Sequence, residues 1–111
     1  MEPEDRVRAL LPWLVPAGPG SKSEALREQL VAPGPRVDPH IVGWADLTPT
    51  AGSKPLRRTE NPRTTYLRRS GEIIGSVLLW FDVEGYVSAL EWLSDTDDEG
   101  FPDPTDLDQP S

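Results

Sequence analysis

The stretch EIIGSVLLWFDVEGYVSALEWLS, residues 72–94, decides the fold of this 111-residue chain. Two runs rich in β-branched and aromatic residues flank the segment 82–85, which ends in glycine. Glycine supplies the positive φ that a tight hairpin turn needs. We therefore expect residues 72–94 to form an antiparallel hairpin at the centre of a sheet.

A two-residue loop of Glu84 and Gly85 would set the register of this hairpin. One face would then hold three cross-strand pairs, namely Phe81 with Ser88, Leu79 with Leu90 and Val77 with Trp92. The other face would hold Leu78, Trp80, Ala89 and Glu91. Since both faces are mainly apolar, we expect the helices to cover one face and a loop or a partner to cover the other.

Two short helices are predicted before residue 35. Apolar residues at 7, 10, 11 and 14 follow the spacing of one helical face, and Pro12 should end or kink that helix. After a Pro/Gly joint, Ser21 and Glu24 match a capping box that opens a second helix to about Val31.

The segment between the helices and the hairpin predicts two further strands, one near His40–Leu47 and one around Thr64–Leu67, separated by a loop over 48–61. The fold class is therefore α+β: two short N-terminal helices packed on a small antiparallel sheet of three or four strands with a C-terminal hairpin. Residues 1–94 form this single domain. Residues 95–111 are expected to form an acidic, Pro-rich tail, flexible or draped on the domain. A solvated tail is the default, and anchoring by Phe101 and Leu107 is the alternative.

Composition excludes several classes of protein. The chain has no cysteine, which rules out disulfides, thiolate nucleophiles and thiolate metal sites. Its longest apolar run is too short to span a membrane, and its acidic start is unlike a signal peptide, so we expect a cytoplasmic protein without membrane contact. A formal net charge of −8 repels phosphate backbones and makes nucleic acid an unfavourable partner.

The tail contains seven acidic residues and no basic one. Six of its positions follow the spacing of a twelve-residue calcium loop, with Gly100 at the turn: Asp95, Asp97, Glu99, Gly100, Asp103 and Asp106. Prolines at 102 and 104 and the terminal aspartate oppose that interpretation, and we predict no metal site and no cofactor. The acids favoured as contacts to a partner are Asp95, Asp97, Asp98, Glu99 and Asp103.

Six of the eleven basic residues lie between residues 54 and 69, opposed only by Glu60. They are Lys54, Arg57, Arg58, Arg63, Arg68 and Arg69. The five arginines are candidate contacts to an anion, with Tyr66 as a stacking group. The alternative, which we favour, is that this segment neutralises the acidic tail within the molecule.

Candidates for catalysis are few. His40 follows Asp38, but no nucleophile accompanies the pair, so a structural histidine is favoured. Glu91 interrupts an apolar strand, and we expect a structural ion pair with an arginine of the basic segment. Of the four tryptophans, most should be core, and Trp80 is our choice as an exposed binding anchor.

The residues Gly85-Tyr86-Val87-Ser88-Ala89-Leu90-Glu91, followed by the acidic segment 98–104, resemble the C-terminal third of short uncharacterised actinobacterial proteins. These share a strand, a turn, the pattern G-Y-x-S-x-L-E and an acidic, Pro-rich ending. The resemblance implies no activity. Some of those proteins carry cysteines upstream, and this chain has none, so no thiol or metal role carries over.

We therefore expect a non-enzymatic protein-binding module. A small acidic antagonist of a basic partner, such as an immunity protein, is the specific version of this hypothesis. The alternative is a small-molecule or metal-ion binding protein. A homodimer through an unpaired sheet edge also stays open.

Overall fold

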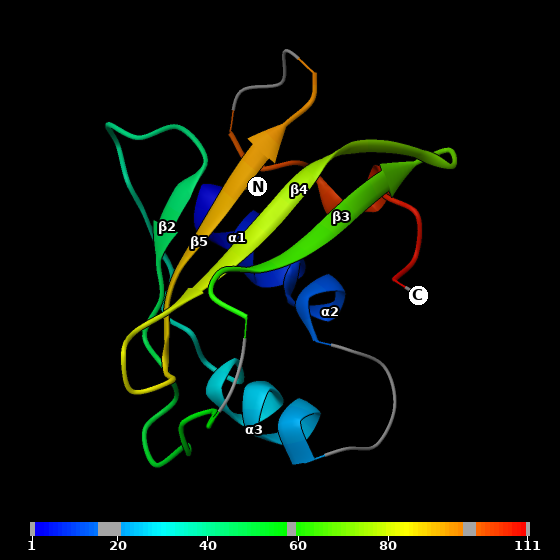
Figure 1. Ribbon diagram of the computed structural model, residues 1–111. Helices are drawn as coiled ribbons and strands as arrows, with labels where there is room; N and C mark the ends of the chain where they lie inside the picture. Colours follow the sequence, from blue (N-terminus) through cyan, green and yellow to red (C-terminus); the bar gives the residue numbers. More distant parts are fainter. Residues whose placement is uncertain (1, 16–20, 58–59, 97–99, 111) are drawn as a thin grey trace.

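The computed structural model describes residues 2–15, 21–57, 60–96 and 100–110, without the side chains of 21–23. It contains three short helices and a five-stranded antiparallel sheet, so the α+β class is confirmed (Figure 1). The helices are α1 (Pro3–Ala9), α2 (Leu11–Leu14) and α3 (Ser21–Gln29), and a 3₁₀ turn, η1 (Pro104–Asp106), lies in the C-terminal segment. The strands are β1 (Arg36–Val37), β2 (Trp44–Asp46), β3 (Arg63–Arg69), β4 (Glu72–Phe81) and β5 (Val87–Ser94).

The strands are ordered β1-β2-β5-β4-β3, and every neighbouring pair is antiparallel. The expectation of three or four strands is therefore wrong by at least one. The strand missed is β1, which is only two residues long and carries too few side chains for a recognisable alternation. The expected central position of the 72–94 hairpin is confirmed, because β5 and β4 both have two strand neighbours.

The first predicted helix is divided in two. The amide of Leu10 donates to the carbonyls of Arg6 and Val7, which closes α1. Pro12 has no amide proton to continue that pattern, so the chain begins a new turn, α2, with Pro12 in its first positions. The predicted effect of Pro12 is confirmed, but it yields two short helices in place of one.

The β4–β5 hairpin is built on a three-residue loop of Val83, Glu84 and Gly85. Asp82 and Tyr86 close this loop, and Gly85 has φ +98°. The longer loop shifts the register by one residue, so Phe81 lies opposite Val87. Ser88 is an extra residue in β5, and this bulge restores the predicted register from the Trp80–Ala89 pair onward. As a result Leu79 does lie opposite Leu90 and Val77 opposite Trp92, as predicted, whereas the predicted Phe81–Ser88 pair is wrong.

The strand expected over 40–47 is shorter because its first half is a turn. The Asp38 carboxylate accepts the backbone amides of His40 and Ile41 at 2.7 and 3.0 Å. Gly43, at φ +76°, then returns the chain to β2, where its carbonyl accepts the amide of Trp92 at 2.7 Å. These residues therefore connect β1 and β2 and are not part of a strand.

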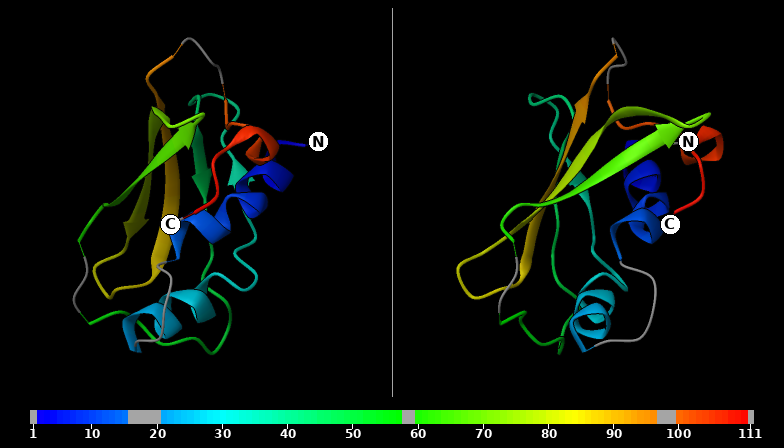
Figure 2. Two further views of the ribbon diagram at one scale, coloured as in Figure 1. Left: turned by 90° about the vertical axis from the view of Figure 1, so that its right-hand side faces the viewer. Right: turned by 45° about the vertical axis from the view of Figure 1, so that its right-hand side comes forward.

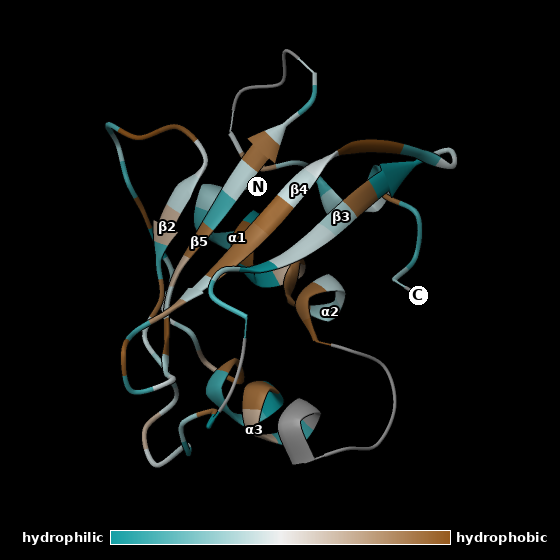
Figure 3. Ribbon diagram, viewed as in Figure 1, coloured by the Kyte–Doolittle hydropathy of each residue, from teal (hydrophilic) through white to brown (hydrophobic). Residues whose placement is uncertain are grey.

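The core lies on one face of the sheet. α1, α2 and the C-terminal segment pack against this face, and α3 lies nearer the β4–β5 turn (Figure 2). Hydrophobic residues follow β4 through the middle of the sheet (Figure 3). The buried side chains that meet between the layers include Val7, Leu10, Leu14, Leu26, Leu67, Val77, Leu79, Leu90 and Trp92.

The described part of the C-terminal segment is packed on the domain. Phe101 and Leu107 are 3% and 5% exposed and belong to the core, as expected of anchors. The Asp108 carboxylate accepts the amides of Ser70 and Gly71, and its carbonyl accepts the Trp13 indole at 2.8 Å. This segment therefore contributes to the domain. Among the described residues, no helix combines the length and apolar character needed to cross a bilayer.

Candidate functional site: the outer face of the sheet

The register defines a second sheet face, which we call the outer face. Residues directly opposite one another on neighbouring strands project to the same side. Trp44, Glu91 and Leu78 form one such row across β2, β5 and β4, and Asp46, Ala89 and Trp80 form the next. A third row contains Leu93, Ser76 and Tyr66.

The outer face carries large side chains that are only partly buried. Tyr66 and Leu93 are 61% and 47% exposed, and Trp44, Leu78 and Trp80 are half-buried. Helices and the C-terminal segment lie on the opposite side of the sheet in both views of Figure 2. Of the two covers expected for this face, a loop or a partner, no loop of the described residues lies over it in these views, and a partner stays a prediction.

Both indoles of the outer face are held by carboxylates. The Trp80 Nε1 donates to Glu91 Oε1 at 3.3 Å across the β4–β5 pair, and the Trp44 Nε1 donates to Asp46 Oδ1 at 3.2 Å along β2. These bonds limit the orientations of the two rings. The two tryptophans thus project from different strands with defined positions, a property of interface anchors that contribute large contact area at low entropic cost.

Glu91 does not form the expected ion pair with an arginine. It is half-buried between Trp44 and Leu78, its register partners, and its contact is the Trp80 indole. Within the described residues the one salt bridge joins Arg8 and Asp5 at 3.1 Å, on the surface of α1. The strand alternation explains the difference, because Glu91 projects to the open face, where water limits the cost of its charge.

The basic residues of the segment 54–69 do not gather into one cluster in the structure. β3 is extended, so Arg63 and Arg69 lie at opposite ends of a strand of about 20 Å. Arg57 belongs to the loop beside the β4–β5 turn, where it lines a recess with Asp82 and Glu84. Arg68 is exposed on the edge strand, and its carbonyl accepts the Asp108 amide at 2.8 Å. Arg58 lies outside the described residues.

The candidate acids of the tail are only partly described. Asp97, Asp98 and Glu99 lie outside the described residues. The amide of Asp95 donates to the carbonyl of Ile74, and the Asp103 carboxylate caps η1 through the amide and hydroxyl of Thr105. These bonds, first the one from the Thr105 amide, lower the pKa of Asp103 below its ordinary value. In the described ranges, no three acidic or histidine side chains gather as a metal site would require.

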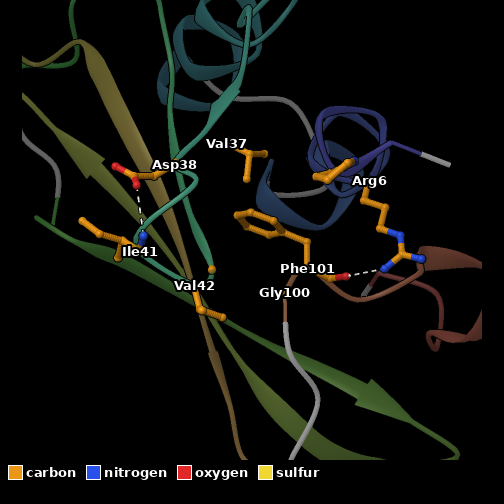
Figure 4. A pocket seen from close by; sticks show the side chains of 9 residues that line it. Arg6, Val37, Asp38, Ile41, Val42, Gly100 and Phe101 are labelled. Carbon is orange, nitrogen blue, oxygen red and sulfur yellow. Dashed lines mark hydrogen bonds between the residues drawn. The ribbon is translucent and has the colours of Figure 1, made fainter.

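A pocket of about 400 Å³ lies between α1, the β1–β2 turn and the C-terminal segment (Figure 4). One guanidinium nitrogen of Arg6 donates to the carbonyl of Phe101 at 3.1 Å, whereas the buried Nε of Arg6 has no hydrogen-bond partner among the described residues. Asp38 closes its own turn. The backbone amide of His40 lowers the pKa of Asp38, with the amide of Ile41 adding to the effect. Asp38 therefore shapes the backbone, and this bond gives no support to a catalytic pair with the His40 ring.

Sequence reasoning missed two residues of the outer face, Trp44 and Asp46, and it named Tyr66 only as a stacking group beside the arginines. The signal that finds Trp44 and Asp46 is the alternation Trp44-Ala45-Asp46, whose central alanine is fully buried. Comparison with known proteins adds no further candidate, since no protein family, no curated protein and no solved structure matches this chain.

Proposed function

We propose that this protein is a non-enzymatic protein-binding module that binds a basic partner protein through its outer face. The observation that carries the proposal is the set of partly exposed aromatic side chains, Trp44, Tyr66 and Trp80, on a sheet face without a described cover. Aromatic residues dominate the hot spots of protein interfaces, and exposed apolar patches mark interaction surfaces.

Charge supports a basic partner. The chain has a formal net charge of −8, and the carboxylates of Asp46 and Glu91 lie among the aromatic rings. A negative surface accelerates encounters with a positive protein and disfavours acidic competitors. A small acidic antagonist, of the kind that an immunity protein provides against a toxin, is the specific version of this proposal.

Site-specific photo-crosslinking tests the proposal in the cells that produce the protein. A photoreactive phenylalanine derivative replaces Tyr66 on the outer face, and in a matched control it replaces Glu28, which is exposed on α3. We expect one abundant basic protein to be crosslinked from position 66 and not from position 28. The product should disappear when Trp44 and Trp80 are both changed to alanine in a chain that retains its cooperative thermal unfolding.

Two results would contradict the proposal. The first is the same set of crosslinked proteins from both positions, since that pattern reports random collision. The second is a specific product that survives the double alanine change, because the partner would then bind without the aromatic side chains that carry the argument.

A further inference from the structure

Strand β3 is the longer of the two edges of the sheet. It has seven residues and its one strand neighbour is β4, whereas the opposite edge, β1, has two residues (Figure 1). An edge strand presents backbone N–H and C=O groups that can pair with another extended chain. The question is therefore which of these groups on β3 are open.

One hydrogen bond at this edge defines the direction of the backbone groups. The carbonyl of Arg68 accepts the amide of Asp108, which is not in a strand, so the backbone groups of Arg68 point away from β4. These groups alternate in direction along a strand, and the bulge in this pair adds its extra residue, Ile74, to β4 and not to β3. The N–H and C=O groups of Thr64 and Tyr66 therefore also point outward, and no backbone group of the described residues outside the strands bonds to them.

Strand β4 gives the same result independently. The Asn61 side chain donates to the carbonyl of Phe81 at 2.9 Å and accepts its amide at 3.0 Å, so both groups of Phe81 point toward the side of β3. The residues two and four positions earlier in β4 point the same way, toward their register partners Arg63 and Thr65. The residues between these partners are thus the ones whose backbone groups are open.

The side chains at both ends of this edge are basic. Arg63 begins β3, Arg68 and Arg69 end it, and the strand contains no acidic residue. None of the three arginines forms a salt bridge with a described residue. Pairing with β3 of a second copy is disfavoured, because the arginines of both copies would gather at the junction, whereas a strand that carries carboxylates is favoured.

The chain's own Asp108 shows that the end of this edge accepts a carboxylate from an extended segment. Besides its backbone bond to Arg68, its carboxylate accepts the amides of Ser70 and Gly71 at 3.0 and 2.8 Å. The open backbone groups begin two residues before Arg68, at Tyr66. Because Tyr66 is 61% exposed, a side chain of an added strand can pack against its ring.

We propose that the edge of β3 binds an extended acidic segment of a partner protein as a sixth strand. The segment bonds through its backbone to Thr64 and Tyr66, and its carboxylates lie beside Arg63 and Arg69 at the two ends. This edge is a second interaction surface. It does not require Trp44 or Trp80, so it is independent of the contact proposed for the outer face.

Nuclear magnetic resonance of the full chain tests the edge with a defined probe, the capped peptide Glu-Val-Thr-Val-Glu. Its control is Lys-Val-Thr-Val-Lys, which has the same central residues and the opposite charge. We expect the acidic peptide to shift the backbone amide signals of Thr64 and Tyr66 more than that of Thr65, which already faces β4. Half-saturation should lie on the order of millimolar, and the basic peptide should leave these signals in place.

Two changes separate the backbone contact from the charge contact. An acidic peptide with N-methyl groups on both valines keeps its charge but loses the donors that face the edge, so it should not bind. Arg63→Gln should weaken binding of the acidic peptide about two- to fivefold, the range of one exposed ion pair. Arg27→Gln makes the same change at an exposed position of α3 and should bind as the unchanged protein does.

The proposal would be overturned by equal shifts with the acidic and basic peptides, by no shift at Thr64 and Tyr66, by undiminished binding of the N-methylated peptide, or by equal effects of the two glutamine variants. Shifts of the same amides with increasing protein concentration, in the absence of peptide, would show that a second copy occupies the edge and would also reject the acidic segment. None of these results alters a crosslinked product that depends on Trp44 and Trp80.

Discussion

The side chain of Gln29 accepts the backbone amide of Val87 at 2.7 Å and so connects the end of α3 to the start of β5. Its amide nitrogen donates to the carbonyls of Gly85 at 3.1 Å and Lys54 at 2.9 Å. Gln29 is fully buried, so water cannot replace these bonds. One side chain therefore holds the helix, the long loop and the hairpin turn together.

Replacing Gln29 with leucine should lower the free energy of unfolding by about 2 to 4 kcal/mol, because it leaves the buried amide of Val87 without its partner and removes the bonds to the carbonyls of Lys54 and Gly85. The Gly85 carbonyl keeps the amide of Leu56. Glu28→Leu, at the exposed neighbouring position, should change it by less than about 0.5 kcal/mol. Chemical denaturation of the three proteins measures the difference. Equal loss in both variants would show that the helix surface, and not this bond network, is responsible.

Gly85→Ala tests the close approach of the hairpin turn to the long loop. A Cβ at position 85 would lie 2.1 Å from the carbonyl oxygen of Leu56, and the backbone has φ +98°. Gly71 also has positive φ, +82°, but a Cβ there meets nothing within 4 Å. We expect Gly71→Ala to cost about 1 kcal/mol from backbone strain and Gly85→Ala at least about 1 kcal/mol more. Similar losses in thermal unfolding experiments would contradict the contact with Leu56.

Asp108→Ala removes the carboxylate that accepts the amides of Ser70 and Gly71 at 3.0 and 2.8 Å. Because these bonds are charge-assisted but lie at the surface, we expect a loss of about 1 to 2 kcal/mol of unfolding free energy. Asp106→Ala makes the same change of charge at an exposed position of η1 and should be nearly neutral. Hydrogen exchange at Gly71 provides the local measurement, and protection that persists in Asp108→Ala would exclude this attachment.

The protonation of Asp38 should make the stability of the fold depend on pH. Hydrogen bonds from the amides of His40 and Ile41, the former the larger effect, lower the pKa of Asp38 below its ordinary value in the folded protein. Its contribution to stability is therefore fully present above the unfolded-state pKa and is lost as the pH falls through the folded-state pKa. The stability difference between the unchanged protein and Asp38→Asn should shrink as the pH decreases below about 4. A carboxyl titration by nuclear magnetic resonance checks the pKa directly, and an ordinary value for Asp38 would remove the argument.

Much of the sheet was predictable because its signals are local. Alternation along 72–94 identified β4 and β5 and, on its outer side, Trp80 and Glu91. The predicted register held in the middle of the hairpin only because the extra residue Ser88 offsets a loop one residue longer than expected. Such a compensation depends on two separate backbone features, and the residue pattern contains no sign of either.

The remaining features depend on contacts that are distant in sequence. The partner of Gln29 lies 58 residues away, and the carbonyl that accepts the Trp13 indole lies 95 residues away. The charge pattern predicted the site least well. The basic residues are close together in the sequence, but Arg63 and Arg69 lie at the two ends of the extended strand β3. The position of Trp44 beside Glu91 requires the β2–β5 pairing, and the chain reaches β2 through the two-residue strand β1 and the Asp38 turn.

Replacement of Trp92 should lower stability much more than replacement of Trp80, because the two side chains lie on opposite faces of the same hairpin. Trp92 is 5% exposed and packs on Gly75 within the core, so Trp92→Ala should cost about 3 to 5 kcal/mol. Trp80 is half-buried on the outer face, and Trp80→Ala should cost only about 1 kcal/mol.

Chemical denaturation measures both losses of stability, and crosslinking from position 66 measures the effect of Trp80→Ala on binding of the partner. If Trp80 serves binding, its replacement abolishes the crosslinked product in a protein that remains folded at the working temperature. A loss of stability as large as that of Trp92→Ala would instead make Trp80 a structural residue and leave the outer face without its anchor.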